Sequence, residues 1–140
     1  MTRGASKFLR FAAPVIGYCA LIFLASSQSD LPGMPVGGSD KIIHFIEYGI
    51  LAWLFARALH GYGVPGARAA VLAVAACGLY GASDELHQRL TPNRFPEGAD
   101  LLADVLGAAA AAAIWYRAQR TRRSDDGDSQ LPGTSSEGRG

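Results

Sequence analysis

Four long apolar segments constrain this sequence more than any other feature. Each is about 18 to 22 residues long, and segments rich in proline and glycine separate them. About 20 apolar residues in a helix are needed to cross the ~30 Å hydrocarbon layer of a bilayer. An open strand would leave its backbone polar groups unsatisfied in lipid, so helices are expected. We predict transmembrane helices over about residues 8–26, 40–60, 67–90 and 100–117.

Composition supports a membrane protein. Of the 140 residues, 49% are apolar and 18% are charged, against about 25% charged in an average soluble domain. The formal net charge of +1 gives no polyanion-binding character, so we expect no nucleic-acid partner. Residues 118–140 contain one leucine and no aromatic residue, too little apolar surface to offset the entropy of ordering. The prediction is an all-α integral membrane bundle of four transmembrane helices within residues 1–117, followed by a disordered cytoplasmic tail.

Two other interpretations of the apolar segments stay open at this point. A soluble all-α bundle would need a wide polar face on its outer helices, and none of the four segments has one. The first segment could also be a cleaved signal peptide, because Arg3, Lys7 and Arg10 precede it and the small residues of ASS follow it.

The basic residues predict the orientation in the membrane. With a cytoplasmic amino terminus, 10 of the 13 basic residues fall on the cytoplasmic side, and only Lys41, Arg89 and Arg94 fall outside. Cytoplasmic segments of membrane proteins carry an excess of lysine and arginine. We therefore expect a multi-pass protein with both termini in the cytoplasm. In the same topology, eight acidic residues lie toward the outer half of the membrane: Asp30, Asp40, Glu47, Asp84, Glu85, Glu97, Asp100 and Asp104.

Helical periodicity brings several polar side chains onto common faces. Residues three or four apart share a helix face, which groups Asp40 with His44 and Glu47, and Asp84 with His87 and Gln88. In the last segment Asp100 and Asp104 lie one turn apart on one face of the helix, and Gly107 and Ala111 lie farther along the same face. Small residues at this spacing allow a neighbouring helix to pack closely. Charges inside a bilayer are costly, so their convergence predicts a site. The candidate catalytic residues are His44, Asp84, Glu85 and Asp100, and the candidate substrate-binding residues are Asp40, Lys41, Gln88, Arg94 and Asp104.

Three interpretations of this cluster compete. The first is structural, with helix caps and ion pairs such as Asp40 with Lys41 or Glu85 with Arg89. The second is a metal or catalytic site, since carboxylates and imidazoles suit divalent ions; the spacing matches no closed zinc signature, so no metal is assigned. The third is a pocket for a lipid-linked or glycosidic head group, with Lys41, Arg89 and Arg94 facing phosphate.

Three stretches of the chain, DKIIHFIEYGILAWL, SDELHQRLTPNR and DLLADVLGAAAA, resemble the VanZ-like family of small bacterial membrane proteins. The resemblance covers about residues 39–113. It implies a place in the bacterial cytoplasmic membrane and an association with the cell envelope, and the family's namesake is linked to low-level resistance to the glycopeptide teicoplanin. The resemblance implies that six positions of this chain are functional, without assigning a role to any of them: His44, Asp84, Glu85, Gln88, Arg94 and Asp100.

Two functions follow as expectations. In the first, the extracytoplasmic-side site binds a membrane lipid, a lipid-linked cell-wall precursor or a glycopeptide antibiotic. In the alternative, the protein is a membrane-embedded hydrolase or transferase for a lipid-linked substrate, with Asp84 or Glu85 as general base and His44 or His87 as its partner.

The orientation has a direct test. A reporter enzyme that is active only outside the cell, fused after Gly140, is expected to be inactive, because the positive charges hold this terminus in the cytoplasm. A cytoplasmic reporter at the same position should be active. Activity of the exported reporter would contradict the predicted topology.

Overall fold

The computed structural model describes residues 2–27, 39–90 and 98–128, without the side chains of Arg3, Ser39, Asp40 and 123–128. All its elements are helical: α1 (Arg3–Lys7), a π-helical turn η1 (Phe8–Ala12), α2 (Ala13–Ser26), α3 (Ser39–Gly61), α4 (Gly66–Gln88) and α5 (Gly98–Asp128). No strand occurs within these described ranges.

Four helical spans are long and apolar enough to cross a membrane: Gly4–Ser26, Lys41–Gly61, Gly66–Gln88 and Gly98–Arg122. The predicted four-helix membrane fold is thus confirmed. The largest difference in a boundary is at the end of α5, which continues to Asp128, past the expected end of the last helix at 117. Residues 118–128 were expected to be disordered and are helical instead, since alanine, glutamine and arginine favour continuation of a helix that has already formed. The rest of the expected tail, 129–140, lies outside the described residues.

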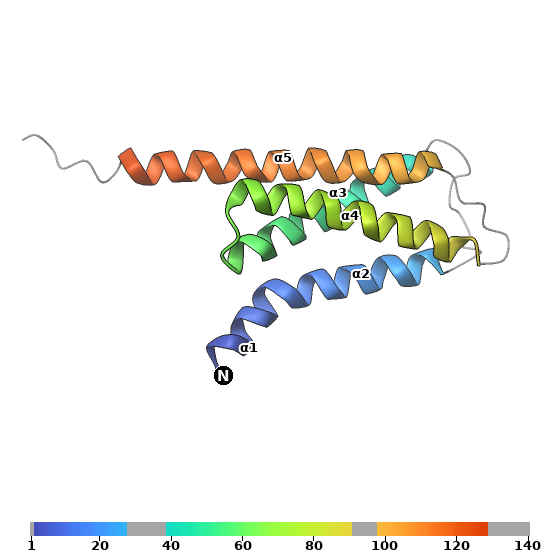
Figure 1. The fold of residues 1–140 in the computed structure, drawn as a ribbon, viewed down its shortest axis with the longest axis horizontal. Helices are drawn as coiled ribbons and strands as arrows, with labels where there is room; N and C mark the ends of the chain where they lie inside the picture. The colour runs from blue at the N-terminus through green and yellow to red at the C-terminus, as the bar shows by residue number, and fades with distance from the viewer. Residues whose placement is uncertain (1, 28–38, 91–97, 129–140) are drawn as a thin grey trace, which may run out of the picture.

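The first span bends where α1 and η1 lead into α2 (Figure 1). Pro14, at the first turn of α2, has no N–H to bond the carbonyl of Arg10, and prolines and π-helical turns are the usual causes of helix kinks. The guanidinium of Arg57 on α3 donates to that freed Arg10 carbonyl, over 2.9 Å. The bend is therefore stabilised by a neighbouring helix.

Helices α3, α4 and α5 pack side by side, and α2 lies along α3 and α4 (Figure 1). Small residues dominate the contact surfaces: Ala52, Cys77 and Ala108 are fully buried around Tyr48 and Leu51. A second cluster, nearer the other end, joins Trp115 to three alanines of α3 and α4. Large apolar side chains such as Leu79 and Leu102 instead point outward, as expected where lipid surrounds the bundle.

Helices α3 and α5 approach each other closely at Gly107. A Cβ atom on Gly107 would overlap the carbonyl group of Phe45, and one on Gly49 would lie 3.4 Å from the Gly107 oxygen and 3.7 Å from the Ala111 Cβ. The predicted stripe of Gly107 and Ala111 therefore does face a neighbouring helix. It fixes the rotation of α5 about its axis and places Asp100 and Asp104 against α3.

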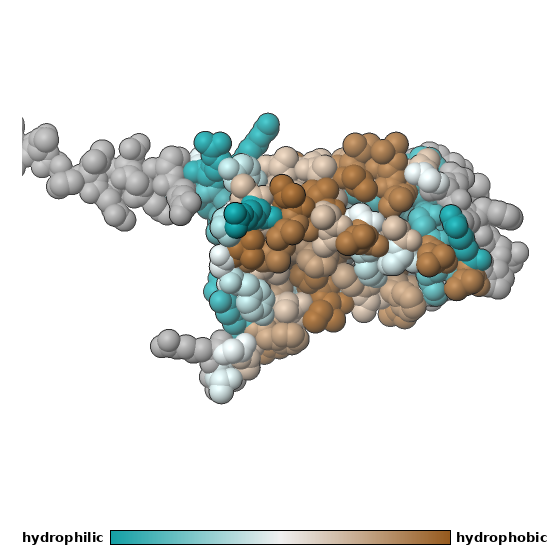
Figure 2. Space-filling model, in the orientation of Figure 1, coloured by the Kyte–Doolittle hydropathy of each residue, from teal (hydrophilic) through white to brown (hydrophobic). Residues whose placement is uncertain are grey.

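The two ends of the bundle differ in chemistry, with an apolar band between them (Figure 2). We call the end at which α2 and α4 finish and α3 and α5 begin the polar end. The opposite end, where α3 finishes and α4 begins, is the arginine end, with exposed Arg68, Arg117, Arg120 and Arg122.

The close approach at Gly107 predicts a large effect of one methyl group. Gly107→Ala should lower the free energy of unfolding by about 1–3 kcal/mol, because the added carbon meets backbone that cannot change rotamer. Gly78→Ala on α4 is the matched control, since its Cβ would lie 3.7 Å from Val105, an ordinary contact. Thermal unfolding in detergent measures both variants, and equal melting temperatures would contradict the packing described.

Candidate functional site

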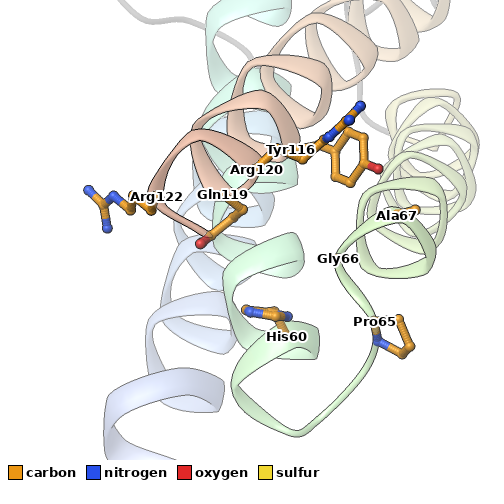
Figure 3. A pocket seen from close by; sticks show the side chains of 8 residues that line it. All are labelled: His60, Pro65, Gly66, Ala67, Tyr116, Gln119, Arg120 and Arg122. Atoms are coloured by element: carbon orange, nitrogen blue, oxygen red, sulfur yellow. The ribbon is translucent and has the colours of Figure 1, made fainter. Parts of the chain in front are cut away.

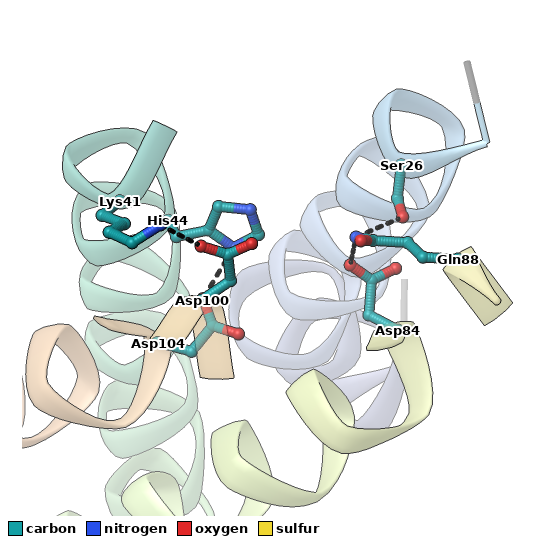
Figure 4. Close-up of polar contacts among 7 residues, drawn as sticks. All are labelled: Ser26, Lys41, His44, Asp84, Gln88, Asp100 and Asp104. Atoms are coloured by element: carbon teal, nitrogen blue, oxygen red, sulfur yellow. Dashed lines mark hydrogen bonds and ion pairs between the residues drawn. The ribbon is translucent and has the colours of Figure 1, made fainter. Parts of the chain in front are cut away.

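The polar end gathers buried polar side chains from four helices (Figure 4). They are Ser26, His44, Asp84, Glu85, Gln88, Asp100 and Asp104, each at most 9% exposed. Six of these were candidates on sequence grounds, and Ser26 was not. Among the other candidates, Lys41 lies at the rim of this cluster, while Arg94 and the side chain of Asp40 lie outside what the structure describes.

His44 and Asp104 form the deepest contact of the site. The Nδ1 atom of His44 lies 2.9 Å from Oδ1 of Asp104, and the Asp104 side chain is only 2% exposed. Gly81 of α4 makes room for this carboxylate, because a Cβ there would lie 2.8 Å from Asp104 Oδ2. A buried carboxylate that bonds one imidazole nitrogen fixes the orientation of the ring.

A second pair connects the same two helices nearer the surface. Lys41 Nζ lies 3.4 Å from Asp100 Oδ1, with the lysine partly exposed and the carboxylate buried. The pair brings a positive charge to the mouth of the cluster. Because its lysine is exposed, its contribution to stability is small, about 0–1 kcal/mol.

Gln88 connects α4 to the end of α2. Its Nε2 donates to Asp84 Oδ2 over 3.0 Å and to Ser26 Oγ over 3.1 Å. Beside it, Ser27 Oγ lies 3.0 Å from His87 Nε2, and the Phe23 and His87 rings have centroids 4.7 Å apart. One feature of the sequence could have identified these serines as site residues: they are hydroxyl residues at the end of an apolar helix.

Two buried polar atoms stand apart from these pairs. Tyr48 Oη and Glu85 Oε1 have no hydrogen-bond partner within the described part of the chain. Tyr48 is fully buried, and its ring is stacked with that of His44 at 6.5 Å between centroids. Glu85 interacts electrostatically with His44, Asp84, Asp100 and Asp104. In folded proteins nearly all buried polar groups are paired, so such exceptions point to a missing partner.

A pocket of about 340 Å³ opens beside Glu85. It lies between the last turns of α4 and the start of α5, and its lining includes Ala82, Glu85, Arg89 and Leu101. Glu85 therefore belongs both to the buried cluster and to a space large enough for part of a small head group.

The geometry of the described residues does not support the interpretation of the cluster as a metal site. Within the described ranges, no group of three or more histidine, cysteine, aspartate or glutamate side chains is placed to hold a metal ion. The carboxylates instead contact His44, Lys41 and Gln88. Pairing of this kind offsets the cost of charge in a membrane interior.

The VanZ/LLP1 family matches residues 17–119 of this chain. The protein belongs to that family. The match extends from α2 into the second half of α5, so it includes every element that contributes to the polar end. No curated protein and no solved structure matches this VanZ-like protein.

The His44–Asp104 contact predicts energetic coupling between the two residues. In a double-mutant cycle of His44→Ala and Asp104→Ala, we expect a coupling energy of about 1–2 kcal/mol, above the ~0.6 kcal/mol average for interhelical hydrogen bonds in a membrane protein. Thermal unfolding of the full chain supplies the measurement. His87→Ala with Asp104→Ala is the control pair and should be additive. Additive effects for His44 and Asp104 would contradict the geometry.

Proposed function

We propose that this VanZ-like protein uses the polar end of its bundle to bind the head group of an envelope ligand. The ligand class is an envelope lipid, a lipid-linked cell-wall precursor or a glycopeptide antibiotic. The distribution of basic residues supports a site on the extracytoplasmic side of the bacterial cytoplasmic membrane, with both chain termini in the cytoplasm. Binding of a glycopeptide or its target would contribute to teicoplanin resistance.

The observation that carries this proposal is a pair of buried atoms, Tyr48 Oη and Glu85 Oε1, for which the described residues provide no hydrogen-bond partner. A buried polar atom without a partner costs about 1–3 kcal/mol, which a ligand that bonds to it recovers. The carboxylate accepts hydrogen bonds, and the phenol both donates and accepts. Sugar hydroxyls and peptide N–H groups supply the required donors, and both occur in glycolipid, precursor and glycopeptide head groups.

The charges at the mouth of the site suit the same class of ligand. Lys41, on the α3 side, and Arg89, at the pocket beside Glu85, offer two cations at the rim. Charged groups at a binding site guide the approach of a ligand of opposite sign. A head group with a phosphate outside and hydrogen-bond donors inside would match both the cationic rim and the acidic interior.

One observation favours a second candidate function. The buried His44–Asp104 contact of 2.9 Å resembles the imidazole–carboxylate arrangement of general acid–base catalysis. On a lipid-linked substrate, His44 would exchange the proton and Asp104 would orient the ring. This arrangement supports a hydrolase or transferase with His44, in place of Asp84 or Glu85, as the group that moves the proton.

Teicoplanin susceptibility separates a ligand site from a structural cluster. A sensitive host that expresses the wild type should tolerate more teicoplanin, and Tyr48→Phe or Glu85→Gln should reverse this at matched membrane levels. Tyr48→Phe removes one hydrogen bond and Glu85→Gln weakens one by removing its charge, and each change is worth roughly a twofold to tenfold fall in affinity. The melting temperature of each variant should stay equal or rise, because Tyr48→Phe removes a buried unpaired hydroxyl and Glu85→Gln removes a buried charge from the unliganded protein.

Two controls make the outcome decisive. Glu137→Gln repeats the amide substitution after the last helix and should leave susceptibility unchanged. His44→Gln distinguishes the enzyme, because loss of acid–base catalysis lowers a rate by roughly 10²- to 10⁴-fold, whereas binding falls in a graded way. Unchanged tolerance in Tyr48→Phe and Glu85→Gln, or tolerance lost only in step with melting temperature, would contradict the binding proposal.

A further inference from the structure

The two ends of the bundle carry pockets of different chemistry. The pocket at the arginine end has a volume of about 540 Å³ and no acidic residue among the described residues that line it. Figure 3 shows Arg120 and Arg122 on opposite sides of α5, so their charges do not converge. The pocket beside Glu85, of about 340 Å³, is lined by a carboxylate and by the guanidinium of Arg89. Of these two pockets, only the one beside Glu85 offers a ligand charges of both signs.

The surroundings of Glu85 favour a cationic ligand. Glu85 is 9% exposed and lines the pocket, and its Oε1 atom has no hydrogen-bond partner in the described part of the chain. The charges that act on it are mostly negative, since one imidazole is outnumbered by three carboxylates: His44 against Asp84, Asp100 and Asp104. Like charges that lie close together in a protein interior repel strongly. A cation in the pocket would relieve this repulsion and also donate to the unpaired oxygen.

A primary ammonium group fits this pocket better than other cations do. Within the described ranges, no three histidine, cysteine, aspartate or glutamate side chains are placed to hold a metal ion. Quaternary ammonium groups are typically held by cages of aromatic rings, and the described lining of this pocket contains no aromatic residue. A primary ammonium, like that of lysine, carries three N–H donors. It therefore supplies both the charge and the hydrogen bond that Glu85 requires.

Arg89 provides the opposite charge at the outer side of the same pocket. It is exposed and lies one turn after Glu85 on α4, about 6 Å farther along the helix axis at 1.5 Å per residue. No ion pair joins these two side chains in the described structure, where the ion pairs are Lys41–Asp100 and His44–Asp104. The planar N–H donors of arginine suit phosphate. A phosphate and an ammonium joined by a short linker would thus contact both side chains at once.

The pocket is reached from the lipid-facing side of the bundle. Ala82 and Leu86 of α4 line it and are exposed, Leu86 to 60%. Leu101 lines it from α5. Exposed apolar side chains on a membrane-spanning helix face acyl chains. A lipid can therefore place its head group between Glu85 and Arg89 while its own chains stay against these leucines.

We propose that the pocket beside Glu85 binds an aminophospholipid, with its primary ammonium at Glu85 and its phosphate at Arg89. This ligand would occupy the head-group site proposed above for the polar end, on which this proposal rests. It narrows the ligand class to zwitterionic head groups of the phosphoethanolamine type. The carboxylate inside and the guanidinium at the rim match the order of the two charges, because the amine is the free end of such a head group.

The test measures lipid binding by the full chain in detergent with native mass spectrometry. Three lipids with identical acyl chains are compared: phosphatidylethanolamine, phosphatidylcholine and phosphatidylglycerol. Phosphatidylcholine keeps the positive charge but has no N–H donor, and phosphatidylglycerol has hydroxyl groups in place of the amine. Water-soluble phosphoethanolamine, added as a competitor, tests whether the acyl chains are needed.

Each of the two pocket variants has a matched control. Glu85→Gln removes the inner charge, and Glu47→Gln removes a half-buried carboxylate of α3 that is not among the charges acting on Glu85. Arg89→Gln removes the charge at the rim, and Arg68→Gln removes an exposed arginine at the other end of α4.

We expect the wild type to bind phosphatidylethanolamine about tenfold more tightly than the other two lipids, since hydrogen bonds between charged groups are the stronger ones. Glu85→Gln should lose this preference but still bind phosphatidylglycerol, which shows that the variant is folded. Arg89→Gln should weaken all three lipids to a similar extent, because all three carry the phosphate. Glu47→Gln and Arg68→Gln should change little.

Three results would overturn the proposal. Equal affinity of the wild type for phosphatidylethanolamine and phosphatidylcholine would mean that the N–H donors play no part. A preference for phosphatidylethanolamine that survived Glu85→Gln would mean that the amine binds elsewhere. If phosphoethanolamine at the same concentration as the lipid displaced it, the ligand would be a soluble phosphate ester.

The failure of this proposal can be told apart from the failure of the head-group site itself. If Glu85→Gln abolished teicoplanin tolerance while lipid preference stayed unchanged, the polar end would still bind a ligand, but not an aminophospholipid. If neither Glu85→Gln nor Tyr48→Phe changed tolerance or the binding of any lipid, both proposals would be wrong.

Discussion

In a lipid bilayer, helices gain little by burying apolar side chains against each other, because lipid chains are equally apolar. Their association depends on close backbone packing and on interhelical hydrogen bonds. In this protein both conditions are met between α3 and α5, where Gly107 touches the Phe45 carbonyl group. One turn away, Asp104 contacts His44 over 2.9 Å. The glycine contact sets the rotation and height of α5, and the polar end depends on that setting.

The interior of the polar end is largely compensated. Asp104 contacts His44, Asp100 contacts Lys41, and Asp84 accepts from Gln88, so the acidic side chains contribute less repulsion than their number suggests. Within the described part of the chain, Glu85 Oε1 and Tyr48 Oη have no such hydrogen-bond partner, and Glu85 also lines a pocket. Stability alone would favour apolar residues at these two positions. A single bound ligand would provide hydrogen-bond partners for both atoms, and we therefore propose that they belong to the ligand site.

The membrane fold was predictable from the sequence because segment length and hydropathy alone require four helices. The meeting of Asp84, Glu85, Asp100 and Asp104 at one end followed from helical periodicity and alternating direction. The pairing of His44 with Asp104 could not be predicted, since it depends on the height of α5 against α3. Tyr48 was not among the candidate residues because an aromatic side chain beside an apolar helix face is typical of the hydrophobic core. The helix over 118–128 was not predicted because the composition of a segment does not show that a helix already formed before it can continue into it.

The most direct test of the ligand site is an experimental structure of the protein extracted from its own membrane with bound lipid retained. We expect density for a bound molecule in the pocket beside α4, with donor atoms about 3 Å from Glu85 Oε1 and Tyr48 Oη. His44 and Asp104 should remain in contact in the same structure. If both atoms instead bonded to side chains of the protein itself, with the pocket filled by acyl chains alone, the proposed ligand site would be wrong.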